Sequence, residues 1–212
     1  MRGEVLLLSS NVNVTASTDA ESMTMAYPWP FGCQILVADF FEPHDLKYRK
    51  GSINFDNVAV YNCSQEDTSF AAIKMDSAIM GVKKVTNSAI SSGLGKGIII
   101  NKSRNINLSG NVIHDFILYG IEAESSSNIL IHNNVVNGIR TVKEDNPPYL
   151  EWSNPLGNIE LHDSKDFEVT DNIAASGYHS GFRLPAWPCG SKPKRLMTGN
   201  VAHSISGFGL IV

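Results

Sequence analysis

The chain has 212 residues, of which 42% are hydrophobic, enough for a domain with a sizeable core. Its 17 basic and 21 acidic residues give a net charge of −4, which excludes a strongly basic protein, and we expect no nucleic-acid partner. No apolar run reaches the ~20 residues of a membrane span, so we expect no direct membrane insertion by this segment.

The first 52 residues show a less regular pattern of apolar and polar residues than the rest of the chain. Residues 1–8 contain too short an apolar stretch for a signal peptide. We expect strands at residues 6–13 and 35–41, where apolar residues dominate. Residues 15–32 are polar at first and then rich in aromatic residues and proline, which predicts a loop folded over an open end of the structure. Residues 1–52 are therefore predicted to form N-terminal coils and a capping loop.

Residues 53–212 contain an imperfect repeat. Asn105 opens the stretch NINLSGNVI, Asn128 opens NILIHNNVV, and Asp166 opens DFEVTDNIA. Each copy has a polar residue, two apolar residues two positions apart, and then Asn followed by an apolar residue. Weaker copies occur near residues 55, 82 and 195. Such repetition is typical of a solenoid, in which each repeat stacks on its neighbour.

The Asn of each copy defines the repeat length. It falls at Asn62, Asn87, Asn111, Asn134, Asn172 and Asn200, with steps of 25, 24, 23, 38 and 28 residues. The 38-residue step holds residues 141–156, whose prolines cannot join a strand ladder, so we predict an inserted loop there. The Asn is expected in a turn, bonded to the Asn above and below it. The alternative is that Asn only marks turns.

The alternation of apolar residues predicts the core. It places Ile106, Ile129 and Phe167 on one face, stacked at ~4.8 Å per coil. A second column is expected at Gly97-Ile98, Gly120-Ile121, Gly181-Phe182 and Gly207-Phe208, with glycine permitting a sharp bend. The predicted fold is all-β, a right-handed parallel β-helix (solenoid) of about six to eight coils with loop insertions. The chain ends in an apolar run, residues 208–212, and we expect it to be part of a longer polypeptide.

Cysteines and sequons are the residues that indicate whether the chain is secreted. Cys33, Cys63 and Cys189 are disulfide candidates, and their odd number leaves one to pair outside the segment; the alternative is three buried reduced thiols. The sequons at Asn13, Asn62, Asn101 and Asn107 are glycosylation candidates if the chain is secreted.

Acidic and histidine side chains supply the candidates for catalysis. Polysaccharide-cleaving enzymes need paired carboxylates or a base beside a charge-neutralising group. Glu122 and Glu124 have period-2 spacing, and Glu160 is expected two coils later by register. The alternative catalytic set is Glu122, Glu160, His162 and His179, with Asp115, Asp163 and Arg183 as further candidates. A solvated outer face is the interpretation that we prefer.

The six histidines do not suggest a metal site. His114 and His203 share a repeat position but lie three coils apart, roughly 14 Å at ~4.8 Å per coil. No phosphate-binding or dinucleotide motif is present either. We therefore expect no cofactor and no metal.

Several stretches resemble the fibrocystin family. Residues 4–12 (EVLLLSSNV) and 31–35 (FGCQI) are similar to the junction that enters its β-helix region, which related cell-surface hyaluronan-degrading proteins share. Residues 171–182 (DNIAASGYHSGF), Pro188-Cys189 and 199–204 (GNVAHS) also resemble fibrocystin. Residues 15–30 and 141–156 depart from the pattern. The resemblance implies a segment of the ectodomain of a large single-pass membrane protein, often at a ciliary or apical surface.

Three functions remain open from the sequence. The first is a non-enzymatic extracellular module, a stiff spacer that contacts neighbouring domains of the same polypeptide, other cell-surface proteins or glycans. The second is a carbohydrate-active enzyme, a polysaccharide lyase or hydrolase. The third is a calcium- or glycan-binding adhesion domain.

Overall fold

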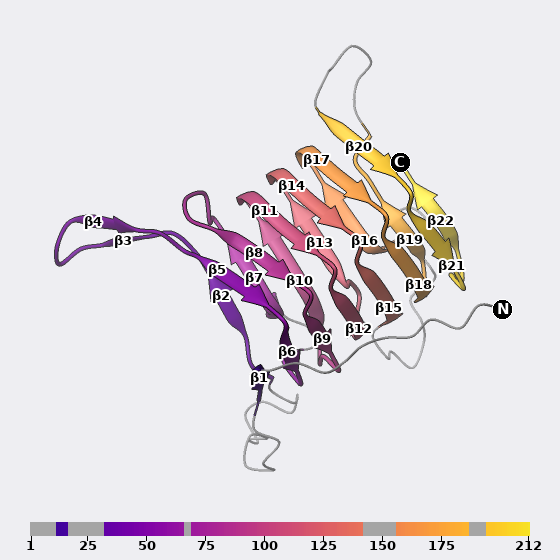
Figure 1. Ribbon diagram of the computed structural model, residues 1–212, viewed down its shortest axis with the longest axis horizontal. Coiled ribbons are helices and arrows are strands. Elements are labelled where there is room, and N and C mark those ends of the chain that lie inside the picture. Colours follow the sequence, from indigo (N-terminus) through magenta and orange to yellow (C-terminus); the bar gives the residue numbers. More distant parts are fainter. Residues whose placement is uncertain (1–11, 17–31, 66–68, 142–155, 187–193) are drawn as a thin grey trace.

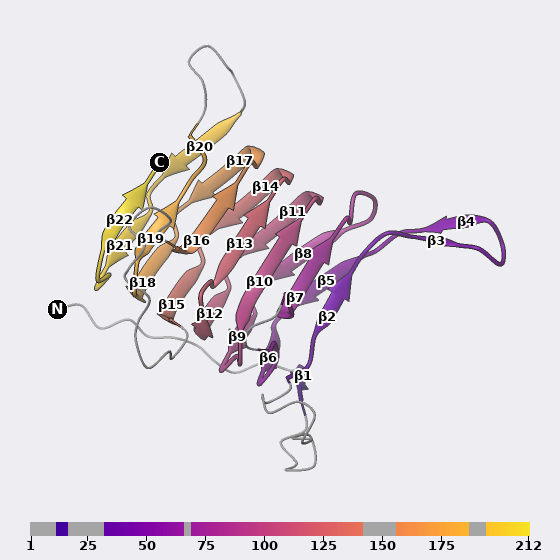
Figure 2. The same cartoon turned by 180° about the vertical axis from the view of Figure 1, so that it is seen from behind.

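The computed structural model describes residues 12–16, 32–65, 69–141, 156–186 and 194–212. Three parallel sheets wind around one core, as Figure 1 shows, and each coil except the last, which has β21 and β22 only, contributes one strand to each sheet. The same stack seen from behind in Figure 2 has no break between the first and last coils. The prediction of a right-handed parallel β-helix is confirmed, with sheets of seven, seven and six strands.

The strands are short and succeed each other in a fixed order. The first sheet contains β1 (Val12–Thr15), β6 (Val58–Tyr61), β9 (Ala89–Ser91), β12 (Val112–Ile117), β15 (Val135–Arg140), β18 (Ile173–Gly177) and β21 (Val201–His203). The second contains β2 (Ile35–Val37), β7 (Ala71–Asp76), β10 (Lys96–Asn101), β13 (Ile121–Glu124), β16 (Gly157–His162), β19 (Ser180–Arg183) and β22 (Phe208–Ile211). The third contains β5 (Ile53–Asp56), β8 (Lys83–Thr86), β11 (Arg104–Ser109), β14 (Ser127–His132), β17 (Lys165–Thr170) and β20 (Arg195–Thr198). Among the residues that the structure describes, no helix is long and apolar enough to cross a membrane.

Inward-facing apolar side chains form continuous columns. Ile106 pairs with Ile129 and Ile129 with Phe167, and each is only 2% exposed, so the predicted column is confirmed. Fully burying side chains of this size stabilises the fold by ~1.5–3 kcal/mol each. In the second sheet, Phe182 pairs with Leu210, so Leu210 takes the place predicted for Phe208.

The glycines of the second sheet are needed for close packing. The sequence predicted that they permit a bend, but neither Gly97 nor Gly120 has a positive φ. A Cβ on Gly97 would overlap the carbonyl oxygen of Gly120, and a Cβ on Gly120 would overlap a methyl group of Val136. These positions exclude larger residues because another part of the stack already fills the space.

Buried asparagines join the coils at one corner. The backbone N–H and the Nδ2 of Asn111 both donate to Oδ1 of Asn134, at 3.0 and 2.9 Å. Asn134 bonds in the same way to Asn172, and Asn172 to Asn200. Each Nδ2 also donates to a backbone carbonyl, as Asn134 does to Leu108 at 2.9 Å. The predicted ladder is therefore confirmed for these four residues.

Asn62 and Asn87 were wrongly assigned to this ladder. The ladder position in the coil of Asn87 is Ser88, whose N–H donates to Oδ1 of Asn111 at 3.0 Å. Asn87 precedes it in the left-handed conformation, with φ of 48°. Asn62, with φ of 54°, lies at the corner after β6. The sequence interpretation merged two neighbouring positions that both favour Asn, one for its backbone and one for its side chain.

A second ladder, of serines, was not predicted. The N–H of Ser103 donates to the hydroxyl of Ser126 at 3.0 Å, and the N–H of Ser126 to that of Ser164 at 3.2 Å. All three serines are at most 2% exposed. The coils that carry both ladders are thus hydrogen-bonded to their neighbours through side chains at two corners.

An antiparallel hairpin leaves the stack between β2 and β5. It consists of β3 (Phe40–Glu42) and β4 (Lys47–Arg49), and it projects as an arm in Figure 1. The expectation of one strand over residues 35–41 is wrong, since the chain turns away after Val37. Asp39 closes the base: its carboxylate accepts hydrogen bonds from the N–H groups of Gly51, Ile79 and Met80 at 2.7–2.8 Å. Burial alone would raise the pKa of Asp39, but these bonds outweigh it and lower the pKa.

Replacing Asn134 with alanine should destabilise the chain strongly. Asn134→Ala removes the acceptor of two bonds from Asn111 and the donor to Leu108, so several buried groups lose partners. At about 1–3 kcal/mol for each buried unsatisfied group, we expect a loss of at least about 3 kcal/mol. Urea unfolding would measure it, with Asn54→Ala on the exposed face of β5 as the control, expected within about 0.5 kcal/mol of wild type. Equal losses in both variants would contradict a role for the ladder.

Lys83 is a charged residue in a column whose other buried members are apolar. It is 1% exposed between Ile53 and Ile106, and its Nζ donates to the carbonyl of Met80 at 3.1 Å. Burial lowers the pKa of Lys83, although Asp39 acts in the opposite sense. Lys83→Met should therefore stabilise the chain by about 1–4 kcal/mol at neutral pH.

The gain from Lys83→Met should decrease at high pH. Because the folded-state pKa of Lys83 lies below its unfolded value, the wild type gains stability as the pH rises through that folded-state pKa towards 10.5. Urea unfolding at pH 7 and pH 10 would measure the change, with Lys84→Met on the exposed face of the same strand as the control. A gain that is the same at both pH values would contradict the buried-ammonium explanation.

Candidate functional site

Some of the predicted acidic and histidine residues lie together on the outer face of the second sheet. Glu122 pairs with Glu160, Glu124 pairs with His162, and Glu160 pairs with Arg183. The expectation that Glu160 lies two coils after Glu122 is wrong: the two residues pair directly, so the 38-residue step is a single coil. Adjacent coils stand ~4.8 Å apart, close to the ~5–5.5 Å that separates the carboxyl groups of retaining glycosidases.

Glu160 is enclosed on all sides by its partners. Its side chain is 0% exposed. One carboxylate oxygen contacts Nε2 of His162 and accepts a hydrogen bond from Nη1 of Arg183 at 2.7 Å. The other oxygen accepts the N–H of Gly157 at 2.7 Å. Burial raises the pKa of Glu160, although the Gly157 N–H, His162 and Arg183 oppose the shift and Glu122 adds to it.

Neighbouring groups extend this cluster to the coil before Glu122, so that it runs over β10, β13, β16 and β19. Nζ of Lys96 lies 3.4 Å from the carboxylate of Glu122 and 5.0 Å from the centre of the Tyr119 ring. Tyr119 is 8% exposed, and burial, followed by the charges of Glu160 and Glu122, raises the pKa of its hydroxyl. The sequence did not single out Lys96 or Tyr119, because they lie before the strand residues that the repeat pattern aligns.

The remaining candidates lie apart from Glu160. His179 stands at the turn before β19, with its ring 5.1 Å from that of Tyr178, and burial lowers the pKa of its imidazole. Asp115 pairs with Arg140 at 2.7 Å in the first sheet, and Asp163 is an exposed turn residue after β16. Of the proposed catalytic set, the structure therefore brings together Glu122, Glu160 and His162.

What this cluster can do chemically depends on whether a substrate or water molecule can reach its side chains. A general base or nucleophile must reach the reacting group directly or through one water molecule. Glu160 has both oxygens bonded and no exposed surface, so it fits a structural ion cluster better than a catalytic carboxyl. Among the described residues, no group of three or more His, Cys, Asp or Glu side chains could hold a metal ion. His114 and His203 share one column three coils apart, as the repeat predicts.

Comparison with known proteins identifies the family. Residues 47–212 match the family described as right handed beta helix region. The chain belongs to the right-handed β-helix family. Fibrocystin from the dog, Canis lupus familiaris, is 22% identical over 205 residues, which are 96% of this chain. The chain spans 4% of the length of fibrocystin. No solved structure gives a significant match.

Two of the three cysteines of this β-helix are bonded to each other. Cys33 and Cys63 lie side by side as an isolated parallel bridge, and their sulfur atoms form a disulfide. It links the coil of β2 to the next one, across 30 residues of sequence. Cys189 lies outside the described residues.

The four sequons occupy different environments in the β-helix. Asn13 is exposed on β1. Asn62 and Asn101 are half-buried, and the serines that complete their sequons, Ser64 and Ser103, are fully buried. Asn107 is half-buried on the outer face of β11.

Replacing Arg183 tests whether the cluster stabilises the fold. Arg183→Met leaves the enclosed carboxyl of Glu160 without its guanidinium partner, and we expect a loss of about 2–4 kcal/mol at pH 7. The loss should be smaller near pH 4, because protonated Glu160 needs no cation. Urea unfolding at both pH values would measure it, with Arg104→Met on the exposed end of β11 as the control. A loss that is independent of pH would contradict the ion-cluster interpretation.

Proposed function

We propose that this β-helix is an extracellular structural and recognition segment of a large fibrocystin-like membrane protein, acting as a stiff spacer between neighbouring domains. The unbroken bonding from coil to coil carries the proposal. Three parallel ladders, the Asn ladder and the Ser ladder all run along the same axis. Bending the axis would strain many of these bonds at once, so the segment should hold its two ends at a fixed separation.

The compartment is supported by the disulfide and by the similarity to fibrocystin. A disulfide persists in oxidising environments, and Cys33 and Cys63 form one here. An apical or ciliary membrane is the location that the resemblance to fibrocystin implies.

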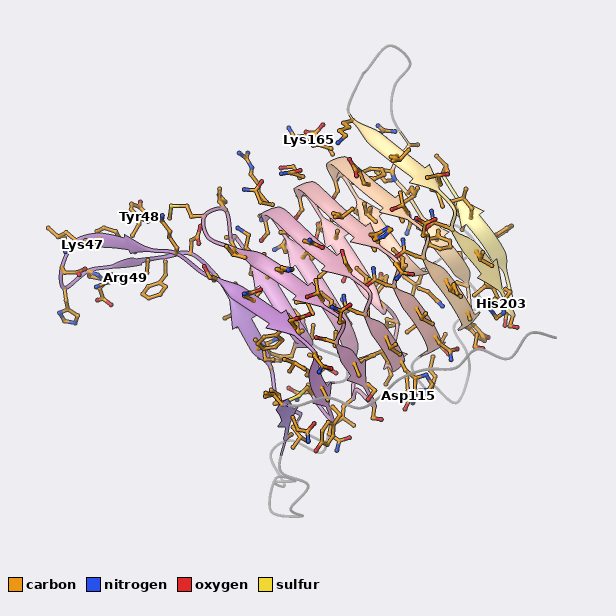
Figure 3. All side chains as sticks on the ribbon, viewed as in Figure 1. Lys47, Tyr48, Arg49, Asp115, Lys165 and His203 are labelled. Atoms are coloured by element: carbon orange, nitrogen blue, oxygen red, sulfur yellow. A yellow bond between two sulfur atoms is a disulfide. The ribbon has the colours of Figure 1, made fainter. Side chains whose placement is uncertain are left out.

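The β3–β4 hairpin supports a recognition role. It projects from the stack, and Figure 3 shows Lys47, Tyr48 and Arg49 on it, away from the coils. Tyr48 is 72% exposed and Phe40 is 54% exposed, while Phe41 packs against Tyr48 with ring centres 5.2 Å apart. Exposed aromatic rings are common anchors for protein partners and sugars. A two-stranded hairpin is only marginally stable alone, so contact with another cell-surface protein or a glycan would stabilise it.

Distance measurements between spin labels would test the spacer role. Asn54 and Leu196 lie in one outward column of the third sheet, five coils apart, which places their backbones ~24 Å apart at ~4.8 Å per coil. Labels on Asn54→Cys and Leu196→Cys, with Cys189→Ser, should give one narrow distance distribution. The pair Tyr48→Cys and Leu196→Cys is the control, because the hairpin is held only at its base. A broad distribution for the first pair would contradict a stiff spacer.

A carbohydrate-active enzyme is the second candidate, favoured by the placement of Glu122 and Glu160 in adjacent coils. Incubation with hyaluronan, pectin and alginate, followed by assays for new reducing ends and unsaturated products, would test it. We expect no turnover. Turnover that disappears when Glu122, Glu160, His162 and His179 are each replaced with alanine would overturn the spacer proposal in favour of the enzyme.

A further inference from the structure

The outer face of the third sheet carries a groove. It is separate from the charged cluster on the second sheet. Its volume is ≈ 300 Å³, and it crosses three coils, β11, β14 and β17. Six of the nine lining residues are polar, although apolar atoms form the larger part of the lining surface, and the residues come from the same positions of successive coils: Asn105, Ile106, Asn107, Asn128, Ile129, Leu130, Asp166, Glu168 and Lys194. Amides, carboxylates and an ammonium group around an apolar floor are groups that can bind the hydroxyls and ring face of a sugar.

Asn107 lies at the edge of this groove and opens the sequon Asn107-Leu108-Ser109. Its Cα partners in the neighbouring coils are Lys84 and Leu130, so its side chain is on the outer face. The hydroxyl of Ser109 donates to Oδ1 of Asn107. Within the described ranges, Nδ2 of Asn107 has no hydrogen-bond partner and is not buried. The atom that would carry a glycan is therefore the one that the fold leaves available.

The sequons at Asn101 and Asn62 have the opposite arrangement. Nδ2 of Asn101 donates to the carboxylate of Asp76 at 3.1 Å, and the hydroxyl of the buried Ser103 accepts the N–H of Ala78 at 3.0 Å. The sequon at Asn62 contains Cys63, which is bonded to Cys33, and its Ser64 is 0% exposed. A glycan at either site would compete with these contacts. The sequon at Asn13 is exposed but lies on β1, away from the groove.

We propose that Asn107 is an N-glycosylation site and that the innermost sugars of its glycan lie in the groove over β11, β14 and β17. The proposal rests on the extracellular location proposed above. In the transfer, Nδ2 of Asn107 attacks C1 of the first sugar of a lipid-linked diphosphate oligosaccharide. A C–N bond forms, the C1–O bond to the diphosphate breaks, the lipid diphosphate leaves with the electron pair, and the amide proton passes to a base of the transferase.

The groove offers specific contacts to that first sugar. Nδ2 of Asn128 already donates to Oδ1 of Asn105 at 2.7 Å, which orders the amides of two coils. Lys194 pairs with Glu168 at the far side, and the N–H of Lys194 donates to Asp166 at 3.2 Å. The half-buried Leu130 beside Asn107 supplies the apolar floor. A sugar ring lying on Leu130 would place its hydroxyls among these polar groups.

Secretion of the chain behind a cleavable signal from mammalian cells would test the modification. Peptide mass spectrometry after release of N-glycans in ¹⁸O water marks each occupied Asn. We expect Asn107 and Asn13 to be occupied, and Asn62 and Asn101 to be empty. Ser109→Ala should abolish the mark at Asn107, and Ser109→Thr should keep it. An unmodified Asn107 in molecules that carry a glycan at Asn13, or secreted disulfide-bonded chain with no glycan at all, would overturn the proposal.

The rate of enzymatic release from the folded protein would test the groove. A glycan whose first sugar lies against protein is shielded, so release at Asn107 should be at least about tenfold slower than at Asn13, a difference of ~1.4 kcal/mol in barrier. Denaturation should equalise the two rates. Leu130→Ser with Glu168→Ala should speed release at Asn107 only. Equal rates in the native wild type would overturn the groove contact, whereas a chain that is never secreted would instead contradict the extracellular location.

Discussion

The register between successive coils is the constraint on which the rest of this structure depends. The side chain of Asn134 accepts two hydrogen bonds from one coil and donates to the next. A slip of one residue would break these bonds and turn every inward side chain of that strand outward. Because register is fixed at two corners, residues 23 to 38 positions apart in sequence are held side by side, and both the charged cluster and the groove are assembled in this way.

The core and the fold class could be predicted because their signal is repeated in every coil. The apolar pairs around Ile106, Ile129 and Phe167 tolerate loops of any length between copies, since only the stacked positions matter. The serine ladder had an equal signal: Ser103, Ser126 and Ser164 are separated by 23 and 38 residues, the same steps as the asparagines at 111, 134 and 172. Serine is common enough in this chain to hide such a match.

What could not be predicted depends on where the chain departs from the repeat. Glu160 was placed one coil too far because a long step can mean either an extra coil or an inserted loop, and the apolar pattern within residues 141–156 does not decide between them. The hairpin after Val37 was missed for a related reason: Phe40 and Phe41 follow an apolar run, and the antiparallel pairing of β3 with β4 and the bonds of Asp39 to distant amides have no signal in the repeat.

Inner and outer positions of a coil have different roles, and this difference explains where function can reside on such a fold. Inward and ladder positions mostly hold residues that fill a column or bond both neighbours, and the buried ammonium of Lys83 is an exception. Outward positions carry no such restriction, so the sheets can differ in chemistry. The second sheet uses its outer face for an enclosed ion cluster around Glu160, and the third leaves an open polar groove beside Asn107. The two sheets face different directions. The side formed by the second sheet can therefore be tightly packed while the side formed by the third sheet carries a sugar.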